Sequence, residues 1–382
     1  MSSCRRSTEF HAKRKGSVMI RGVKGGDEMV GVLLTAGKGV RMRPLTDRRA
    51  KGSLPLCNLP LFAHGLHILR GWGCRKVVMN LHSHPDSIIS LLPDTRPEGL
   101  QVELSRESTL MGSAGGIKKM ERHLSGGPFW ILNGDTVLDL EFEAMLDRHQ
   151  TSGALATLAL TPQPHGSKYS PVEIDDDGFI VRIAGMPKAG RRGRPHTFIG
   201  VQLAEPDLLG HIPPGIPVGI TNEVYPRLIR AGAKLAGFVT LGFWVEMGNP
   251  AAYVRANLRF LDESRIFPRN RYLNPLPGLF TEGEMAMVGW EPQGPALLAK
   301  RVRIGPGVRL EGGVILGKGV VAGRECRIRR TLLWEGSRVG EGAILEDCLV
   351  GGATIPAGAT LVGKVALPGE GSETRILELG SP

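Results

Sequence analysis

The sequence predicts an α/β fold, in which a Rossmann-like, doubly wound, mostly parallel sheet is followed by a hexapeptide β-helix. Three observations support this prediction. Strand-like and helix-like patterns alternate from residue 30 to residue 160, a glycine-rich loop directly follows the first apolar run, and a six-residue rhythm of aliphatic residues begins at Val302. Alternating patterns favour a parallel sheet with helices on both faces, and hexapeptide repeats are typical of β-helices.

The elements of the first region follow from its apolar runs and their spacing. Continuous apolar runs predict buried strands, and apolar residues at helical spacing predict helices. The resulting order is helix 61–69, strand 76–81, helix 87–92, strand 100–104, helix 114–124, strand 129–132, helix 142–149 and strand 154–160. We expect the second helix to stop at Pro93, because proline is unfavourable inside a helix. Ligands bind beyond the carboxyl ends of parallel strands, so loops 105–116 and 133–136 are expected to converge on the first glycine loop.

The chain changes character after residue 262, which closes a domain beginning at residue 29. Residues 263–298 are rich in proline and interpreted as a linker, residues 299–365 as the β-helix and residues 366–382 as a C-terminal tail. Apolar side chains recur at intervals of six from Ile304 to Trp334, after which the register slips and resumes near Val339. A glycine-rich β-meander is the alternative. Residues 299–382 contain no histidine, so a histidine-dependent acyltransferase activity is not expected there.

Composition narrows the class of protein. The formal net charge is +11, but aromatic residues make up only 5% of the chain, which leaves few platforms for stacking bases and argues against nucleic-acid binding. Residues 1–28 are expected to form a basic, disordered tail. Because Met29 directly precedes the first strand, one hypothesis is that this tail is an artefact of the gene model. The five dispersed cysteines favour reduced thiols and a cytoplasmic location. No apolar run is long enough for a membrane helix.

The glycine loop carries the clearest chemical signal. After an apolar run, residues 33–55 read LLTAGKGVRMRPLTDRRAKGSLP. Glycines let backbone N–H groups approach phosphate oxygens, and Arg41 and Lys51 supply cations, so the loop is expected to bind a triphosphate. A P-loop is excluded because no Gly-Lys-Ser/Thr follows, and a dinucleotide fingerprint is excluded because Met42 stands at its third glycine.

The pattern G-x-G-x-R-x-x-P-L-T followed by a lysine resembles the opening motif of the sugar-phosphate nucleotidylyltransferases. Val40 replaces the usual threonine and Ala50 the usual proline before the lysine, whereas Lys51 and Pro55 match. The resemblance implies transfer of a nucleotidyl group from a nucleoside triphosphate to a sugar 1-phosphate. It also implies that the repeat region is left-handed. We expect this region to serve assembly into a homo-oligomer, regulation or stability.

The resemblance assigns nucleotide-binding residues. Arg41 is expected at the leaving β,γ-phosphates and Lys51 at the α-phosphate, both as catalytic residues. The backbone of Gly37, Lys38 and Gly39 should lie beneath the phosphates. The small residues of LMGSAGG (110–116), with Gly112 and Gly115 matching the family, should lie against the base.

A magnesium site is expected beside the phosphates. Asp135 follows a strand in an Asn-Gly-Asp sequence that resembles the family's metal site, and Mg²⁺ prefers carboxylate oxygens. An Asx turn is the alternative interpretation of this sequence. The resemblance supplies Glu246 as the second ligand, where the family has an aspartate.

The sugar side departs from the family. Family members place a glutamate and a lysine where this chain has Gly185 and Met186. Arg182, Lys188 or the basic cluster at 191–194 are the candidate substitutes for that lysine. Three further positions fall where family members contact the sugar: Tyr169, Glu173 and Gly200. The missing pair also motivates a second hypothesis, a non-catalytic regulatory homologue that binds nucleotide or NDP-sugar and acts on a partner.

Overall fold

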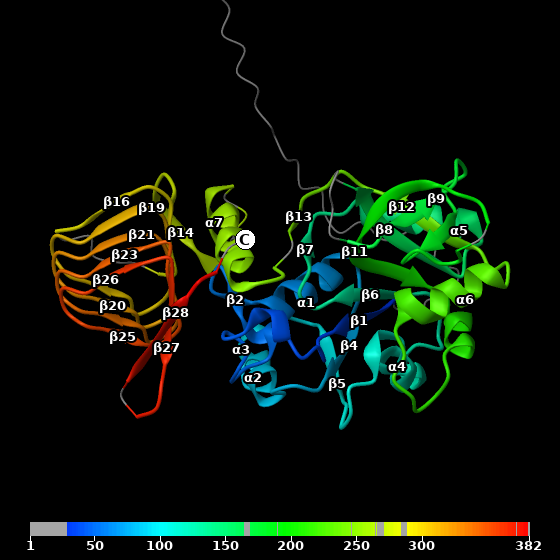
Figure 1. Cartoon of the computed structure of the whole chain (residues 1–382), viewed down its shortest axis with the longest axis horizontal. Coiled ribbons are helices and arrows are strands. Elements are labelled where there is room, and N and C mark those ends of the chain that lie inside the picture. The colour runs from blue at the N-terminus through cyan, green and yellow to red at the C-terminus, as the bar shows by residue number, and fades with distance from the viewer. Residues whose placement is uncertain are drawn as a thin grey trace, which may run out of the picture.

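The computed structural model describes residues 29–163, 169–188, 190–245, 247–263, 265, 271–283, 289–371 and 373–380. Two parts lie side by side: an N-terminal part built on a sheet flanked by helices, and a C-terminal part of stacked strands (Figure 1). The predicted tail 1–28 and the predicted metal ligand Glu246 lie outside the described residues.

The N-terminal part is organised by one mixed sheet. Its order is β10-β9-β11-β6-β1-β4-β5, with β8 joined to β11 and β12 to β8. The strands are β1 (Val30–Leu34), β4 (Lys76–Leu81), β5 (Gln101–Arg106), β6 (Phe129–Asn133), β8 (Ala156–Pro162), β9 (Val172–Ile174), β10 (Ile180–Ile183), β11 (Arg194–Ala204) and β12 (Leu235–Val239). Strands β1, β4, β5 and β6 are parallel, as predicted, whereas β11 runs antiparallel between β6 and β8. The carboxyl ends of β1 and β6 therefore meet at one edge.

Helices cover both faces of this sheet. They are α1 (Leu61–Gly71), α2 (Asp86–Ile89), α3 (Leu92–Thr95), α4 (Gly112–Lys119), α5 (Phe142–Ser152) and α6 (Tyr225–Arg230), whereas α7 (Pro250–Asp262) packs against the C-terminal part. Short turns of other helix types are η1 (Val40–Met42), η2 (Lys51–Ser53), η3 (Glu121–His123), η4 (Pro206–His211) and η5 (Ile220–Val224). Short two-stranded pairs join β2 (Pro55–Leu56) to β3 (Leu59–Pro60) and β7 (Val137–Leu138) to β13 (Trp244–Val245).

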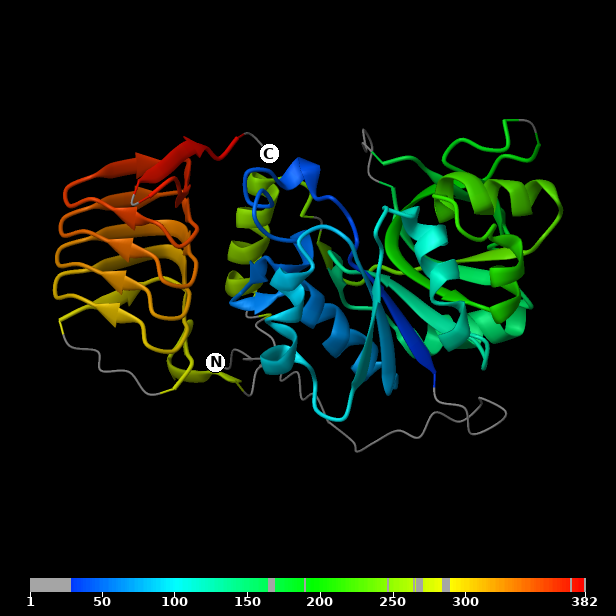
Figure 2. The same cartoon turned by 90° about the horizontal axis from the view of Figure 1, so that it is seen from below.

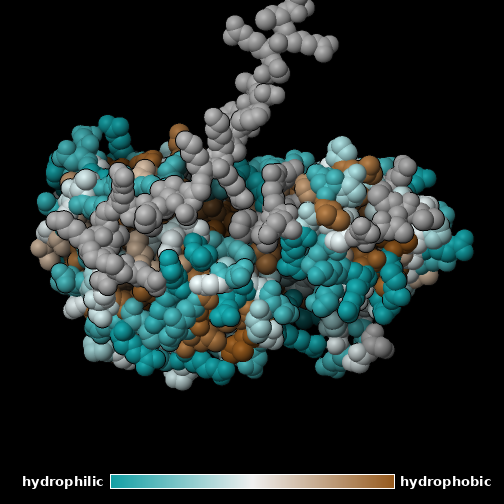
Figure 3. All heavy atoms as spheres, turned by 180° about the vertical axis from the view of Figure 1, so that it is seen from behind, coloured by the Kyte–Doolittle hydropathy of each residue, from teal (hydrophilic) through white to brown (hydrophobic). Residues whose placement is uncertain are grey.

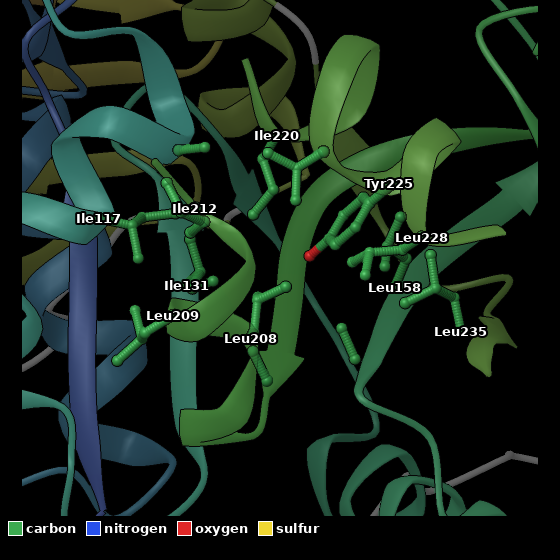
Figure 4. Close-up of a cluster of buried hydrophobic side chains, with 14 of the residues drawn as sticks. Ile117, Ile131, Leu158, Leu208, Leu209, Ile212, Ile220, Tyr225, Leu228 and Leu235 are labelled. Carbon is green, nitrogen blue, oxygen red and sulfur yellow. The ribbon is translucent and has the colours of Figure 1, made fainter. Parts of the chain in front are cut away.

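Alternate residues of β1 face two different cores. Val32 packs with residues of α4, η4 and α6, and this cluster is drawn in Figure 4 around Ile131 and Tyr225. Leu33 packs on the other face with residues of α1 and α5. Because neighbouring side chains of a strand point to opposite faces, an uninterrupted apolar run predicts burial on both. The doubly wound arrangement is thus confirmed.

Two helix predictions are corrected. The segment expected as one helix over 87–92 forms α2 and α3, and Pro93 lies in the first turn of α3, where its missing N–H costs no hydrogen bond. The helix expected over 114–124 begins at Gly112 and ends at Lys119, followed by the 3₁₀ turn η3.

The C-terminal part is a stack of coils, seen edge-on in Figure 2. Its strands are β14 (Leu273–Leu276), β15 (Leu279–Thr281), β16 (Glu291–Gln293), β17 (Ala296–Leu298), β18 (Arg303–Ile304), β19 (Arg309–Leu316), β20 (Val321–Ala322), β21 (Arg327–Leu333), β22 (Arg338–Val339), β23 (Ile344–Glu346), β24 (Leu349–Val350), β25 (Thr354–Ile355), β26 (Thr360–Val362), β27 (Lys364–Pro368) and β28 (Thr374–Glu378). Successive coils pair in parallel, which is consistent with the predicted β-helix.

The slip in the six-residue rhythm has a structural cause. Ile304 pairs with Ala322, Ala322 with Val339 and Val339 with Ile355, so successive coils contain 18, 17 and 16 residues. After the first shortened coil, the residue that faces the interior is Leu333 rather than Trp334. The tryptophan packs against the N-terminal part.

Two boundaries differ from the sequence-based division. Strands β15 and β17 lie within the expected linker 263–298, yet they pair in parallel with each other, and β17 pairs with β19. The prolines of this segment had obscured its periodicity. Likewise, β28 lies within the expected tail 366–382 and pairs antiparallel with β27.

The two parts share an apolar interface. One ladder of stacked residues faces the N-terminal part: Leu297, Ile315, Leu332, Leu349 and Val365. Residues of α7, including Tyr253 and Val254, belong to the same cluster. Asn58 adds a polar contact by donating from Nδ2 to the Leu316 carbonyl, 3.0 Å away.

The rest of the visible surface is mixed. In Figure 3 hydrophilic residues predominate and apolar residues form scattered patches. Among the described helices, none is both long and apolar enough to cross a membrane.

Candidate active site

The glycine loop leaves the carboxyl end of β1 and is held from both sides. Asn80, on neighbouring β4, accepts hydrogen bonds at Oδ1 from the backbone N–H groups of Thr35 and Ala36, at 2.7 and 3.3 Å. Farther along, Thr46 donates from Oγ1 to the Gly39 carbonyl at 2.8 Å. Gly39 has φ of +64°, which favours glycine. The loop is therefore fixed at its ends, and Gly37 between them has open space around it.

Lys51 and Asp135 lie in contact, although 84 residues separate them in the sequence. The Lys51 ammonium is 2.6 Å from Asp135 Oδ2. The neighbouring Gly134 brings the aspartate loop against the glycine loop: its N–H donates to the Leu34 carbonyl at 2.9 Å, and an added Cβ would lie 2.5 Å from the Thr35 methyl group. The predicted convergence of these loops is confirmed.

A cavity of about 300 Å³ lies between the glycine loop and the start of α4. Its lining includes Gly37, Lys51, Gly112 and Asp135. Gly112 has φ of +70°, and an added Cβ would lie 2.6 Å from the Val218 carbonyl oxygen. An added Cβ on Gly115 would lie 2.8 Å from the Ile216 carbonyl oxygen. Glycine is thus required at both positions, because the backbone near residues 216–218 approaches too closely for a side chain. The adjoining cavity has the size that small ligands occupy.

A buried polar network connects the two walls of this cavity and was missed by the sequence reasoning. Asn80 donates from Nδ2 to Glu107 Oε1 at 2.8 Å, and Glu107 Oε2 accepts from the Met111 N–H at 2.9 Å. Asn80 and Glu107 are both buried, with exposures of 3% and 5%. The available signal was a pair of polar residues at the carboxyl ends of two neighbouring strands.

A second cavity, of about 150 Å³, adjoins the first. The two share Lys51 and Asp135 in their linings. The second cavity is also lined by Arg41, Tyr169 and Gly200. The Tyr169 ring lies against that of Trp244, with centroids 5.8 Å apart. Gly200 has φ of +86°, and an added Cβ would lie 2.6 Å from Thr136 Oγ1.

Other predicted residues lie elsewhere. Glu173 is absent from the described linings of both cavities: its Oε1 is 3.5 Å from Arg182 Nε, and its Oε2 accepts from the Gly193 N–H at 3.1 Å. Lys38 is exposed and also outside both linings. Arg41 lines the second cavity and not the first, and its role at the β,γ-phosphates stays a prediction.

The acidic residues at the site fit a hard cation only in part. Asp135 is one carboxylate beside a phosphate-sized space, and Mg²⁺ commonly uses one or two carboxylates together with water and substrate phosphates. Within the described ranges, no group of three or more His, Cys, Asp or Glu residues could hold a metal ion.

Comparison with known proteins gives one family match. A model described as nucleotidyl transferase matches residues 30–263, more than half of the chain. The match begins at β1 and ends just after α7, so it spans both cavities.

Curated relatives extend across both parts. A UTP–glucose-1-phosphate uridylyltransferase of Synechocystis is 28% identical, covering 85% of this chain and 87% of that protein. A mannose-1-phosphate guanylyltransferase of Mycobacterium tuberculosis is 29% identical, covering 82% of each. A probable mannose-1-phosphate guanylyltransferase of rice is 29% identical, covering 92% of this chain and 99% of its own.

Solved structures support the fold of the N-terminal part. HddC of Yersinia pseudotuberculosis superimposes with a TM-score of 0.52 at 20% identity, covering 61% of this chain and 99% of its own. A second structure of that protein, in complex with GMP-PN, gives the same TM-score at 19% identity.

Proposed function

Because this chain belongs to the nucleotidyl transferase family, we propose that it transfers a nucleotidyl group from a nucleoside triphosphate to a sugar 1-phosphate. The products are an NDP-sugar and pyrophosphate. The curated relatives are sugar-1-phosphate nucleotidyltransferases, which agrees with NDP-sugar synthesis. The observation that carries the proposal is the pair of adjoining cavities that share Lys51 and Asp135. One cavity suits the nucleotide, and the other suits the sugar phosphate.

The reaction needs positioning and charge more than acid–base chemistry. An oxygen of the sugar phosphate attacks the α-phosphorus, and the bond from that phosphorus to the oxygen bridging to the β-phosphorus breaks with its electron pair going to pyrophosphate. The nucleophile is already ionised, so no protein base is required. Lys51, at the junction of the cavities, is suited to the α-phosphate, and the glycine loop supplies N–H donors. Tyr169 and Gly200 are suited to the sugar.

We also propose that Mg²⁺ assists, with Asp135 as a ligand and Glu246 as a second candidate. The ion would offset phosphate charge. Lys51 now neutralises Asp135, so binding of a cation there would free the ammonium for the substrate.

The base and the sugar are expected to belong to the pairs used by relatives. GTP with mannose 1-phosphate and UTP with glucose 1-phosphate are the first choices, and dTTP with glucose 1-phosphate is a third. Four of the five cysteines are described, and all four are buried free thiols, which supports the proposal of a cytoplasmic enzyme. We expect the β-helix to mediate homo-oligomer formation.

A non-catalytic regulator is the second candidate, because Gly185 and Met186 replace a charged pair. The test is pyrophosphate release with Mg²⁺ across the substrate pairs above. Release that requires both substrates supports the enzyme. Nucleotide binding without release from any pair would contradict it and favour the regulator.

A further inference from the structure

A buried hydrogen-bonded pair joins two loops at the first cavity. Asn80 lies near the end of β4, and Glu107 directly follows β5, which pairs in parallel with β4 (Figure 1). Both residues are buried, and Asn80 Nδ2 donates to Glu107 Oε1 at 2.8 Å. On one side the Asn80–Glu107 pair holds the start of the glycine loop, and on the other it holds the loop 110–116.

Glu107 determines which atom of the Asn80 amide faces the glycine loop. Both Glu107 oxygens accept, one from Asn80 Nδ2 and the other from the Met111 N–H. The amide nitrogen of Asn80 therefore faces Glu107, and its oxygen faces the backbone N–H groups of Thr35 and Ala36. A half-turn of this amide would place donor against donor on one side and acceptor against acceptor on the other. The glycine loop is thus held in place only while Glu107 accepts.

Helix α4 packs directly on the pair. An added Cβ on Gly116 would lie 2.8 Å from both Asn80 Nδ2 and Glu107 Oε1. Met111, whose N–H is held by Glu107, immediately precedes the helix, and its carbonyl accepts from the Val218 N–H at 2.9 Å. Asn80 belongs to the described lining of the first cavity, whereas Glu107 does not. Glu107 therefore acts on the cavity through Asn80 and Met111.

We propose that Glu107 is a positioning residue that sets the place of loop 110–116 relative to the glycine loop, and thereby the affinity for the nucleoside triphosphate. This inference rests on the proposed function, in which the triphosphate group contacts one loop and the base the other. Loops that are already held in place need not be ordered by the ligand, which favours binding. The described lining of the second cavity contains neither residue of the pair and no part of loop 110–116. Affinity for the sugar 1-phosphate should therefore not depend on Glu107.

The first test is Glu107→Gln in the full chain, with titration calorimetry of GTP, UTP and dTTP in the presence of Mg²⁺. The new amide has one acceptor where two donors need one each. We expect the Kd of the triphosphate that the wild type binds best to rise about 5- to 50-fold, because the free energy that ordered the loops must now come from binding. The KM for sugar 1-phosphate should change less than about threefold. Charge alone predicts no such loss, since removing an acid beside an anion site does not weaken anion binding.

Matched variants separate geometry from charge and from folding. Glu107→Asp keeps the acid but withdraws it by one methylene, so it should also raise the triphosphate Kd. Adding Asn80→Asp to Glu107→Gln exchanges donor and acceptor and restores each bond of the pair; this double variant should bind triphosphate more tightly than Glu107→Gln alone. Glu103→Gln is the control, because Glu103 lies on β5, is partly exposed and pairs with Lys76 at 3.1 Å. Denaturant unfolding shows that the titrated variants are folded.

Three results would overturn the inference while leaving the function standing. The first is a triphosphate Kd within twofold of wild type in both Glu107 variants. The second is an equal loss of affinity for triphosphate and sugar 1-phosphate in a folded variant, as a merely structural role predicts. The third is a folded double variant that binds no more tightly than Glu107→Gln. Wild-type protein that binds triphosphate but turns over no substrate pair would instead contradict the proposed function, and the Kd comparison would still test the pair.

Discussion

At the scale of single residues, the site depends on the contact between Lys51 and Asp135. The lysine side chain is 16% exposed and the aspartate side chain 41%, so a phosphate entering either cavity can reach the ammonium. A compact point charge suits a reacting phosphate whose geometry changes during the reaction. Removing the Lys51 ammonium would leave the negative Asp135 carboxylate unpaired, facing the negatively charged phosphates of the substrates.

We therefore predict that Lys51→Ala lowers kcat/KM at least about 100-fold, the usual cost of removing one group that stabilises transition-state charge. Lys318→Ala is the control, because that exposed lysine lies in the C-terminal part. Initial rates of pyrophosphate release measure the effect. A wild-type kcat/KM in Lys51→Ala would contradict this prediction, because it would show that the ammonium only pairs with Asp135 and does not act on the substrate.

A second residue-scale prediction concerns pH. Burial lowers the pKa of His64 to about 4, from an ordinary value of 6.5. Between these values the unfolded chain binds the proton and the folded chain does not, so stability falls as pH drops from about 6.5 to 4. His64 contributes up to about 1.4 kcal/mol per pH unit to this slope. Urea unfolding at several pH values should show a flatter slope for His64→Gln than for wild type; equal slopes would contradict the prediction.

At the scale of elements, the strands and the loops that follow them were predictable, whereas the side-chain hydrogen bonds between neighbouring strands were not. Strand 76–81 and the loop after residue 34 follow from apolar runs and glycines. The Asn80–Glu107 pair does not, because polar residues at the carboxyl ends of two strands do not by themselves show that their side chains will be buried together. Similarly, the sequence predicts that Pro93 ends a helix, but Pro93 lies in the first turn of α3.

The start of α4 provides the element-scale prediction. Gly112→Ala should reduce both stability and nucleotide affinity, because alanine meets the Val218 carbonyl oxygen and disfavours φ of +70°. We expect a loss of about 1–3 kcal/mol in the free energy of unfolding. Gly71→Ala, with open space in its helix, is the control. Denaturant unfolding and nucleotide titration measure the two effects, and a Gly112→Ala protein that matches Gly71→Ala would contradict this explanation.

At the scale of the whole molecule, the C-terminal coils pack on the N-terminal part through the ladder that contains Leu332. The repeat was predictable from its six-residue rhythm. The first coil was not predictable, because prolines mask its periodicity. The face that docks on the N-terminal part was not predictable either, because it depends on coil lengths of 18, 17 and 16 residues. The loop 42–54 has residues in the same apolar cluster, so docking also supports the segment between Arg41 and Lys51.

Leu332→Asp should therefore destabilise the protein by about 3–5 kcal/mol, since it leaves a cavity and buries a charge at the interface. Val362→Asp is the matched control, because Val362 is 54% exposed and lies two coils farther along the same stack. Chemical denaturation of both variants provides the measurement. Equal stabilities would mean that the ladder is not a tightly packed interface.

The central claim is that a sugar phosphate oxygen attacks the α-phosphorus at the junction of the two cavities. Mass spectrometry with a sugar 1-phosphate carrying ¹⁸O in its phosphate tests this most directly. We predict an NDP-sugar that retains every labelled oxygen, with unlabelled pyrophosphate released in equal amount. Label in the released pyrophosphate, or no NDP-sugar from any substrate pair, would contradict the claim.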